Sequence, residues 1–229
     1  MSGPVAEDES VGRLKLNRVH HPVTVLGHGT RAGIWVQGCA LACAGCMSRD
    51  TWDERPESSV AVADVLSWVR GLPEPLHGVT VSGGEPLQQP SALAELLEGL
   101  REMSAARQEE FDLLVYSGHP WSKLAARAAY RAALAAADAV VAGPYVDRRN
   151  TGVALRGSDN QRVVPLTPLG RRRYGTDALA SHTGPRLQTG VDGDGSVWIV
   201  GIPRRADLRR WEQSLRRAGV RWRGASWND

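Results

Sequence analysis

Three cysteines lie close together in the chain, and their residue type and spacing make them the first candidates for chemistry. Cys39, Cys43 and Cys46 are the only 3 cysteines among 229 residues. Intervals of four and then three residues on a tight loop could bring three thiolates to one small site. An odd number of thiols in such a short window excludes a disulfide framework, which needs pairs spread along the chain. We therefore expect a metal or redox site.

The spacing alone leaves several kinds of site open. It favours a [4Fe-4S] cube, because three thiolates leave one iron free for a ligand that is not part of the protein. A structural zinc site would need a fourth ligand. Three histidines upstream could supply it: His20, His21 and His28. The last two cysteines could instead form a dithiol redox centre, although the first would then have no role.

A second candidate feature is the β-rich run that ends with Ser82, Gly83, Gly84 and Glu85. In α/β proteins, ligands bind at the carboxyl ends of strands, which is where this run predicts the glycine pair. Glycines let the backbone approach a ligand closely and leave its N–H and C=O groups free. Glu85 could pair with an ammonium group. Alone the run is more typical of a plain turn, but beside the cysteine loop it indicates a cofactor site.

Hydrophobic patterning predicts the elements that must position these residues. Between residues 20 and 165, short β-branched runs alternate with longer Ala- and Leu-rich segments, which is typical of βα units around a parallel sheet. The expected strands are 22–26, 33–37, 78–82, 112–116, 138–142 and 161–164. The expected helices are 58–70, 89–103 and 121–137. The sequence therefore predicts an α/β fold.

The pattern changes after residue 165, and we divide the chain accordingly. Four segments are expected: an N-terminal leader over 1–20, the main α/β domain over 21–165, a linker over 166–185 and an accessory ββα element over 186–229. In the accessory element, the runs 187–191 and 197–200 flank an Asp-Gly-Asp-Gly turn and predict a hairpin. A helix is expected over 204–218.

Composition and charge argue against other classes of protein. The chain has 28 Lys and Arg against 25 Asp and Glu, a net charge of +3. No base-stacking aromatic motif accompanies the basic residues, so we expect no nucleic-acid partner. The first ten residues lack the order of a signal peptide, and the longest uncharged run, 32–48, is a poor candidate for a membrane span because it holds all three cysteines. We expect a cytoplasmic protein in a reducing compartment, with no membrane partner.

Together the motifs resemble those of radical S-adenosylmethionine (SAM) enzymes, in the group that activates glycyl-radical enzymes and includes the anaerobic ribonucleotide reductase activases. Segment 27–31 resembles the group's Gly-Pro-Gly-x-Arg approach to the cluster, with His28 in place of the proline. Further segments that resemble the group are 35–38, 49–52, 82–88, 116–119 and 156–162. The resemblance covers about residues 20 to 165.

The resemblance implies a partial (β/α)6 TIM-like barrel with a parallel sheet, and an oxidoreductase that uses a [4Fe-4S] cluster and SAM. Cys39, Cys43 and Cys46 would hold the cluster, and SAM would chelate its fourth iron. Glu85, with the two preceding glycines, would receive the amino group of SAM. The full set of cofactor-binding residues that it implies is Gly45, Met47, Ser82, Gly83, Gly84, Glu85, Ser117 and Asn160.

The resemblance also implies a reaction and partners. SAM would be cleaved reductively to methionine and a 5′-deoxyadenosyl radical, which would abstract hydrogen from a glycine of a partner glycyl-radical enzyme. The electron donor would be a protein such as flavodoxin or ferredoxin. Two alternatives stay open: a radical SAM enzyme that modifies a peptide or small natural product, and a zinc-bound interaction module. Met47, where the group usually has Tyr or His, and Ala142, where activases often have Asp, leave the substrate open.

Overall fold

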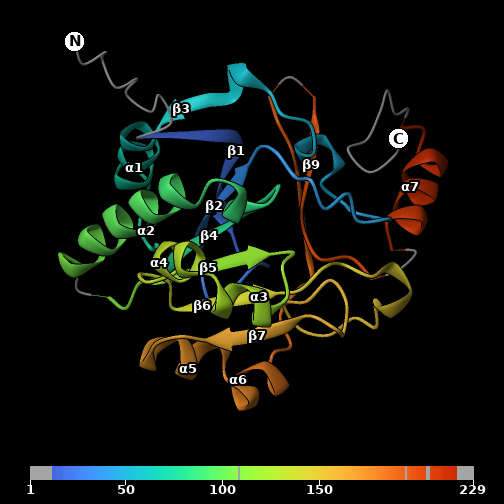
Figure 1. The fold of residues 1–229 in the computed structure, drawn as a ribbon. Coiled ribbons are helices and arrows are strands. Elements are labelled where there is room, and N and C mark those ends of the chain that lie inside the picture. The colour runs from blue at the N-terminus through green and yellow to red at the C-terminus, as the bar shows by residue number, and fades with distance from the viewer. Residues whose placement is uncertain (1–11, 108, 194, 205–206, 221–229) are drawn as a thin grey trace, which may run out of the picture.

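The structure is a computed structural model, and it describes residues 12–107, 109–193, 195–204 and 207–220. Its centre is one sheet of seven strands in the order β3-β1-β2-β4-β5-β6-β7 (Figure 1). Four neighbouring strands run parallel: β2 (Arg31–Val36), β4 (Gly78–Gly83), β5 (Asp112–Ser117) and β6 (Ala139–Ala142). The outer strands are antiparallel to their neighbours: β1 (Arg13–Val23), β3 (Ser59–Ala61) and β7 (Arg162–Pro165). The chain is a mixed α/β protein with a mostly parallel central sheet.

Four helices pack with the sheet into one apolar core. They are α1 (Val62–Arg70), α2 (Pro90–Ala105), α3 (Trp121–Ala126) and α4 (Ala128–Ala133). Four leucines of α2, spaced by three or four residues, are fully buried: Leu93, Leu96, Leu97 and Leu100. This spacing puts them on one face of the helix, and that face lies in the same core as the valines of β4. The expected helix over 121–137 is interrupted at Arg127, whose backbone is extended.

The expected sheet was fully parallel, and the structure corrects this at both ends. The connection from β1 to β2, residues 24–30, is too short for the crossover that a parallel pair requires. The connection from β6 to β7 contains only a short 3-10 turn, Asp147–Arg149, so the chain returns beside β6 without a covering helix. The three other 3-10 turns are Arg49–Thr51, Pro56–Ser58 and Pro86–Gln88.

Two segments expected to lie outside the main domain contain regular structure. Residues 13–20 belong to β1, which pairs with both β2 and β3 and buries Leu14 completely, so this part of the expected leader is a strand of the main sheet. The expected linker contains α5 (Pro168–Tyr174) and α6 (Thr176–Ala180). The hydroxyl of Thr167 accepts a hydrogen bond from the N–H of Gly170 at 3.0 Å and so caps the start of α5. Pro168 in the first turn also favours a helix start at this point.

The C-terminal region has the expected ββα order. It comprises β8 (Leu187–Val191), β9 (Val197–Gly201) and α7 (Asp207–Arg217). Strands β8 and β9 form a separate two-stranded sheet. Figure 1 shows α7 on the side of the molecule opposite α1 and α2. Among the described helices, none is both long enough and apolar enough to cross a membrane.

A buried ion pair joins the amino-terminal ends of the parallel strands. Arg31 at the start of β2 and Asp112 at the start of β5 are both 0% exposed, and the guanidinium donates to the two carboxylate oxygens at 2.7 and 3.0 Å. Arg31 also donates to Thr80 of β4 at 2.7 Å. Segment 27–31 was expected to approach the cluster, but it lies at the end of β2 opposite Cys39. The role of Arg31 in this structure is therefore to join three strands.

The carboxylate of Asp112 is held in its charged form. The hydroxyl of Tyr174 donates to it at 2.7 Å, and Arg173 also pairs with it. Burial by itself raises the pKa of Asp112, but the charge of Arg31 and the hydrogen bonds from Arg31, Tyr174 and Arg173 outweigh burial, so the pKa lies below its usual value. The pKa of Arg31 is raised by the same pair, despite its burial.

We predict that Asp112→Asn lowers the free energy of unfolding by about 3 to 5 kcal/mol, because the charge of Arg31 would remain buried without its counterion. The folded pKa of Asp112 is depressed, so its stabilising contribution is complete above the unfolded pKa of about 4 and is lost as pH falls through the folded value. The difference between wild type and variant should therefore shrink below about pH 4. Denaturant titrations at several pH values measure it.

Asp159→Asn is the matched control. Asp159 pairs with Arg149 on the surface, where the two side chains are 36% and 50% exposed. This substitution should change the free energy of unfolding by less than about 1 kcal/mol, because solvent screens exposed pairs. Equal losses in the two variants would contradict the structural role of the buried pair.

Candidate functional site

The candidate site lies at the carboxyl end of the parallel strands. A cavity of about 750 Å³ opens there, between the loop that follows β2 and the ends of β4 and β5. All three cysteines line it, together with Gly83, Gly84 and Glu85 of the second motif. The two motifs, separated by some forty residues in the sequence, therefore face one space. The parallel pairing of β2 with β4 produces this meeting, because adjacent parallel strands end at the same edge.

The cysteine loop is shaped by residues with left-handed backbone and fixed by hydrogen bonds. Gly38 and Gly45 have positive φ values of 97° and 75°, which only glycine adopts without strain. Ala42 also has a positive φ, of 45°. The N–H of Cys39 donates to the carbonyl of Trp52 at 2.9 Å, and the N–H of Cys46 donates to the carbonyl of Cys43 at 3.1 Å. The loop therefore folds back on itself and presents its thiols on one side.

The three thiols are half-buried, and their surroundings are those of thiols that a bound cation would convert to thiolates. Burial raises the pKa of Cys39 and of Cys43, and the nearby charge of Glu85 adds to the rise. Backbone N–H groups oppose it, from Leu41 and Ala42 at Cys39 and from Tyr145 at Cys43. Metal binding would supply the positive charge that stabilises the deprotonated form.

The donor set fits an iron–sulfur cluster, because all three thiols line one cavity and a [4Fe-4S] cube takes one thiolate on each of three irons. The three histidines considered as a fourth zinc ligand are not among the residues that line the cavity. His20 instead packs against Trp198, with ring centroids 4.2 Å apart.

Glu85 is the most buried acid of the cavity, with 1% of its surface exposed. Its Oε1 accepts hydrogen bonds from the N–H of Leu87 at 3.0 Å and from the hydroxyl of Ser117 at 2.9 Å. Its Oε2 accepts one from the N–H of Gly118 at 2.7 Å. Burial raises the pKa of Glu85 above its usual value, although these donors and the charge of Lys123 oppose the rise. The carboxylate thus joins β4 to β5 at the cavity wall.

Of the other residues that the sequence predicted for this site, four line the cavity and one does not. Gly45, Met47, Ser82 and Ser117 all line the cavity. Asn160 is not among the lining residues, and its side chain donates to the carbonyl of Pro144 at 2.8 Å instead. The adjacent Gln161 lines the cavity and bridges Gly157 and Gly143, each at 2.8 Å. Of the two neighbouring amide side chains in this motif, the one that lines the cavity is thus Gln161, in the turn before β7.

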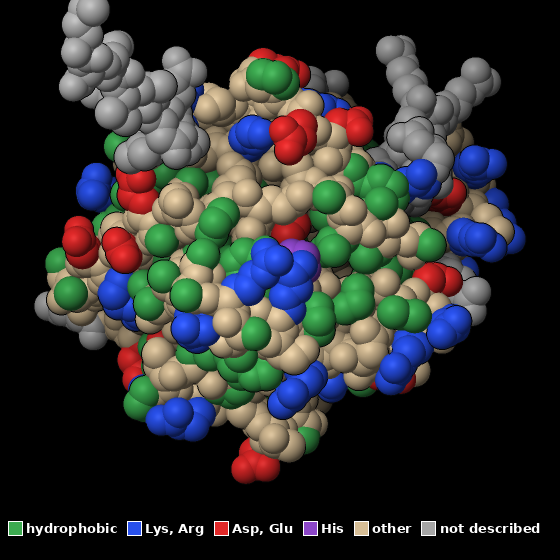
Figure 2. Space-filling model, viewed as in Figure 1, with side chains coloured by type: hydrophobic (Ala, Val, Ile, Leu, Met, Phe, Trp, Pro, Cys, Tyr) green, Lys and Arg blue, Asp and Glu red, His purple; other side chains and the backbone are tan. Residues whose placement is uncertain are grey.

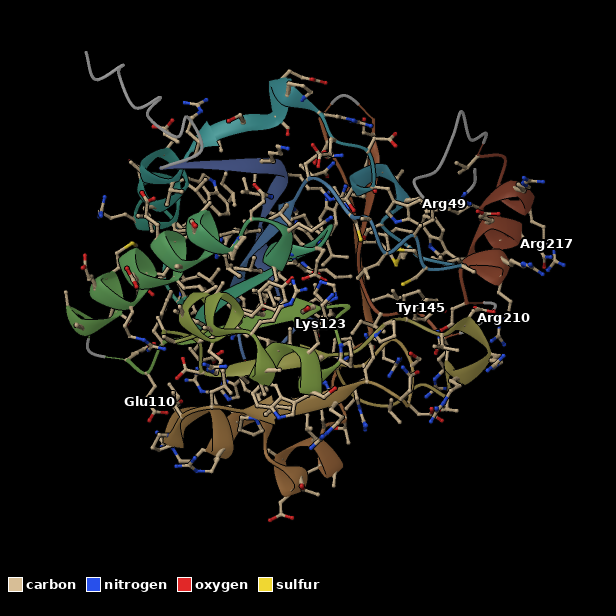
Figure 3. The ribbon with its side chains drawn as sticks, in the orientation of Figure 1. Arg49, Glu110, Lys123, Tyr145, Arg210 and Arg217 are labelled. Carbon is tan, nitrogen blue, oxygen red and sulfur yellow. The ribbon has the colours of Figure 1, made fainter. Side chains whose placement is uncertain are left out.

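Several lining residues carried no sequence signal. Tyr145 follows β6, lines the cavity and donates its hydroxyl to Asp147 at 3.0 Å; Figure 3 shows it below Arg49 in this view. Asn150 also lines the cavity and donates to the carbonyl of Pro203 at 2.9 Å. The largest unexpected contribution comes from the end of β9 and the residues after it, Ile199 to Arg204, and from Leu208 and Arg209 of α7.

Comparison with known proteins shows similarity to an iron–sulfur domain family and to activating enzymes. A family model described as a 4Fe-4S single cluster domain matches residues 25–164. The anaerobic ribonucleoside-triphosphate reductase-activating protein of Pasteurella multocida is 29% identical over 158 residues, which are 65% of this chain and 96% of that protein. The pyruvate formate-lyase-activating enzyme of Staphylococcus aureus is 38% identical over 94 residues, 38% of this chain and 37% of that enzyme.

A solved structure, QueE from Escherichia coli, superposes with a TM-score of 0.38 at 19% identity, over 46% of this chain and 52% of that chain. The family match includes the cysteine loop, the end of β4 and the end of β5, so it spans the residues that bring the two motifs to one cavity. The chain therefore belongs to the family of 4Fe-4S single cluster domains, and it is a radical SAM enzyme of the activating-enzyme group, with an iron–sulfur cluster and SAM as its cofactors.

Proposed function

We propose that this chain activates a glycyl-radical enzyme, by abstracting hydrogen from a glycine of that partner protein. The observation that carries the proposal is the single cavity in which three half-buried thiols face Glu85. The activating proteins with which the chain shares its family support it. In this proposal the protein works in the reducing cytoplasm, where thiols stay available to iron, and receives electrons from a donor such as flavodoxin or ferredoxin.

In the proposed mechanism Cys39, Cys43 and Cys46 hold the cluster. When bound and reduced, the cluster supplies the electron that cleaves SAM to methionine and a 5′-deoxyadenosyl radical, and the cofactors supply this chemistry while the protein orients them. A carboxylate offers about four acceptor positions, and protein donors use three of those on Glu85. The remaining position is proposed to receive the ammonium group of SAM.

Other lining residues are proposed to position SAM without taking part in proton or electron transfer. The backbone of Gly45 and the thioether of Met47 would lie along the adenine, which suits a polarizable, apolar side chain. Ser82 and Ser117 would face the methionine and ribose portions. Since Ser117 donates its hydroxyl proton to Glu85 and accepts from the N–H of His119 at 3.1 Å, one lone pair of its oxygen is left for a ligand. The amide side chain that lines the cavity here is that of Gln161, rather than that of Asn160 as the sequence predicted.

The fold supports a finer proposal, that the open sheet is a partial barrel with the cofactors at its carboxyl-terminal end. Four parallel strands end at the cavity, and the residues that follow β2, β4, β5 and β6 all contribute to its lining. In this proposal residues 186–229 form an accessory element on the main domain.

A second candidate function is the modification of a peptide or small natural product by the same radical chemistry. One observation favours it. Residues from the C-terminal region line the cavity, yet they lie outside the segment 25–164 that matches the family. A substrate-facing wall that the family model does not include is consistent with a different hydrogen donor.

The two functions are separated by one anaerobic experiment. The protein is reconstituted with iron and sulfide and given dithionite, SAM and a purified anaerobic ribonucleoside-triphosphate reductase. The proposed function predicts 5′-deoxyadenosine release and a glycyl-radical signal in the paramagnetic resonance spectrum of the reductase. Release of 5′-deoxyadenosine without that signal, also with pyruvate formate-lyase as partner, would favour the second function. Tightly bound stoichiometric zinc with no SAM cleavage would contradict both.

Cys43→Ala is predicted to lower the iron and sulfide content after reconstitution to a small fraction of the wild-type value, because a cube held by two thiolates loses a strong ligand. Iron and sulfide assays with the absorbance near 400 nm measure this. The control is Ala44→Ser, an exposed position in the same loop that should retain the full cluster. A Cys43→Ala protein that retains a full cluster would refute the three-ligand assignment.

Glu85→Gln is predicted to weaken SAM binding about tenfold or more while the cluster stays intact, because a charged hydrogen bond to ammonium contributes about 1.5 to 3 kcal/mol. Calorimetric titration of the reconstituted protein with SAM measures the affinity. Glutamine also has one fewer acceptor for the donors around it, so thermal unfolding of the same sample checks the fold. The control is Glu57→Gln, an exposed position. Unchanged SAM affinity would mean that Glu85 only joins β4 to β5.

Gly84→Ala is predicted to separate the two motifs. A Cβ atom at Gly84 would lie 2.3 Å from the carbonyl oxygen of Gly38, so β4 and the cysteine loop would have to move apart. We expect reduced cluster retention and a lower melting temperature. Gly71→Ala is the control, because its Cβ would meet only ordinary contacts at 3.6 Å and the position has a helical φ. Equal behaviour of the two variants would show that the close approach is not needed.

A further inference from the structure

The C-terminal region builds one wall of the cavity, although it lies outside the segment that matches the family. The family model covers residues 25–164, and the Pasteurella multocida protein is matched over 96% of its length by only 65% of this chain. The wall consists of the lining residues Ile199, Val200, Gly201, Ile202, Pro203, Arg204, Leu208 and Arg209. We call this set the C-terminal wall. It faces the same space as the cysteines and Glu85.

Contacts with the main domain fix the C-terminal wall in place. The side chain of Gln188 donates to the carbonyl of Pro22 at 2.8 Å and accepts from the N–H of Thr24 at 3.0 Å. Val200 is 6% exposed and belongs to a core cluster with Trp35. These contacts join the hairpin to the segment that ends β1, so the wall is part of the folded unit and can position a ligand.

The wall combines apolar side chains with two basic ones. Arg204 and Arg209 are exposed and line the cavity. Neither side chain has a hydrogen bond or ion pair with another residue of the described ranges. Arg18, a third basic residue of the lining, differs because it pairs with Asp50. Two guanidinium groups at the cavity are therefore available to an anionic ligand.

A further guanidinium group, that of Arg186, lies near Arg204. Arg186 donates from Nη1 to the carbonyl of Gly152 at 2.8 Å, while its Nε and Nη2 atoms are buried and have no partner. Burial and the nearby charge of Arg204 lower the pKa of Arg186, and Asp207 opposes this. Asp207 itself pairs with Arg210 at 3.1 Å. Asp147 of the cavity lining accepts a hydrogen bond from the hydroxyl of Tyr145 at 3.0 Å, so Asp147 and Asp207 both have partners already.

The basic surface continues from the cavity along α7. Arg210, Arg216 and Arg217 are exposed, and Figure 2 shows Lys and Arg side chains gathered on this side of the molecule. Figure 3 shows Arg210 and Arg217 pointing away from the sheet. From Arg209 to Arg217 the helix rises about 12 Å at 1.5 Å per residue. A small acid bound at Arg209 could not reach the far end, whereas an extended polypeptide could.

We propose that the C-terminal wall and α7 dock an acidic segment of a polypeptide substrate. Arg204 and Arg209 bind carboxylates beside the residue that enters the cavity, and the outer arginines of α7 bind further acidic side chains. The apolar residues of the wall pack against the backbone and small side chains of the entering segment. The inference rests on the proposed function in one respect, that the hydrogen donor is part of a polypeptide.

The test measures binding without turnover, so its failure is distinct from failure of the proposed function. A fluorescein-labelled dodecapeptide with a central glycine flanked by glutamates is titrated with the reconstituted protein in the presence of SAM and without reductant. Fluorescence anisotropy gives its affinity. A second peptide carries glutamine at every glutamate position. We expect the glutamate peptide to bind at least about fivefold more tightly, with the difference reduced as sodium chloride is raised from about 50 to 300 mM.

Variants then locate the contact. Arg209→Glu and the double variant R204Q/R209Q should each lose most of the preference for glutamate over glutamine. The matched control is Arg70→Glu, an exposed arginine in the last turn of α1 that is remote from the cavity lining. Equal binding of the two peptides to the wild type, or an equal loss in R70E and R209E, would overturn the proposal. Circular dichroism confirms that each variant is folded.

Competition with glutarate tests whether the arginines bind carboxylates of a polypeptide or those of a small acid. The proposal expects that millimolar glutarate leaves most of the labelled glutamate peptide bound, because a small acid held by two arginines binds more weakly than a peptide that also contacts the apolar wall and the outer arginines of α7. Complete displacement by glutarate, with the same dependence on Arg204 and Arg209, would assign the site to a small carboxylic acid and overturn the polypeptide proposal.

Discussion

The parallel pairing of β2 with β4 is the constraint on which the rest of the site depends. The register runs from Arg31 opposite Gly78 to Val36 opposite Gly83, so both strands end together. Beyond that end, the N–H of Glu85 donates to the carbonyl of Gly38 at 2.9 Å. This hydrogen bond continues the ladder into the two functional loops. The cysteine loop and the acidic loop are therefore held at a fixed separation by backbone geometry, before any side chain contributes.

The opposite ends of the same strands are held by charge. Arg31 and Asp112 are completely buried, and burial of two ions is expensive unless each finds a partner with good geometry. Here the guanidinium and the carboxylate form a two-point contact, and Tyr174 from α5 completes it. Since α5 belongs to the segment after β7, the pair also ties a later part of the chain to the central sheet. Strand ends with no ligand are thus fixed as firmly as those that face the cavity.

The cavity has two walls with different chemistry. One contains thiols, glycines and a buried carboxylate from the region that matches the 4Fe-4S single cluster domain. The other contains apolar side chains and two arginines from the C-terminal region. A radical enzyme must exclude water from its reacting centre while admitting a substrate, and a second wall separate from the cofactor wall can vary with the substrate. This division of the cavity is why a shared reaction and a particular substrate can be built into one fold.

The sequence by itself identified the candidate residues of the cofactor wall, because thiol spacing and a Gly-Gly-Glu strand end depend on neighbours only a few residues apart; spacing alone left the kind of site open, and the resemblance of several motifs to one family favoured the cluster. It also predicted the parallel strands and the leucine face of α2, since these follow from local periodicity. Only the tertiary structure decided that residues 13–20 form a strand of the main sheet, that Arg31 pairs with Asp112 at the end of the strands away from the cavity, and that Gln161 lines the cavity where Asn160 was expected. The same holds for Arg204 and Arg209 in the second wall. Each of these depends on contacts between residues far apart in the chain, which leave no periodic pattern in the sequence.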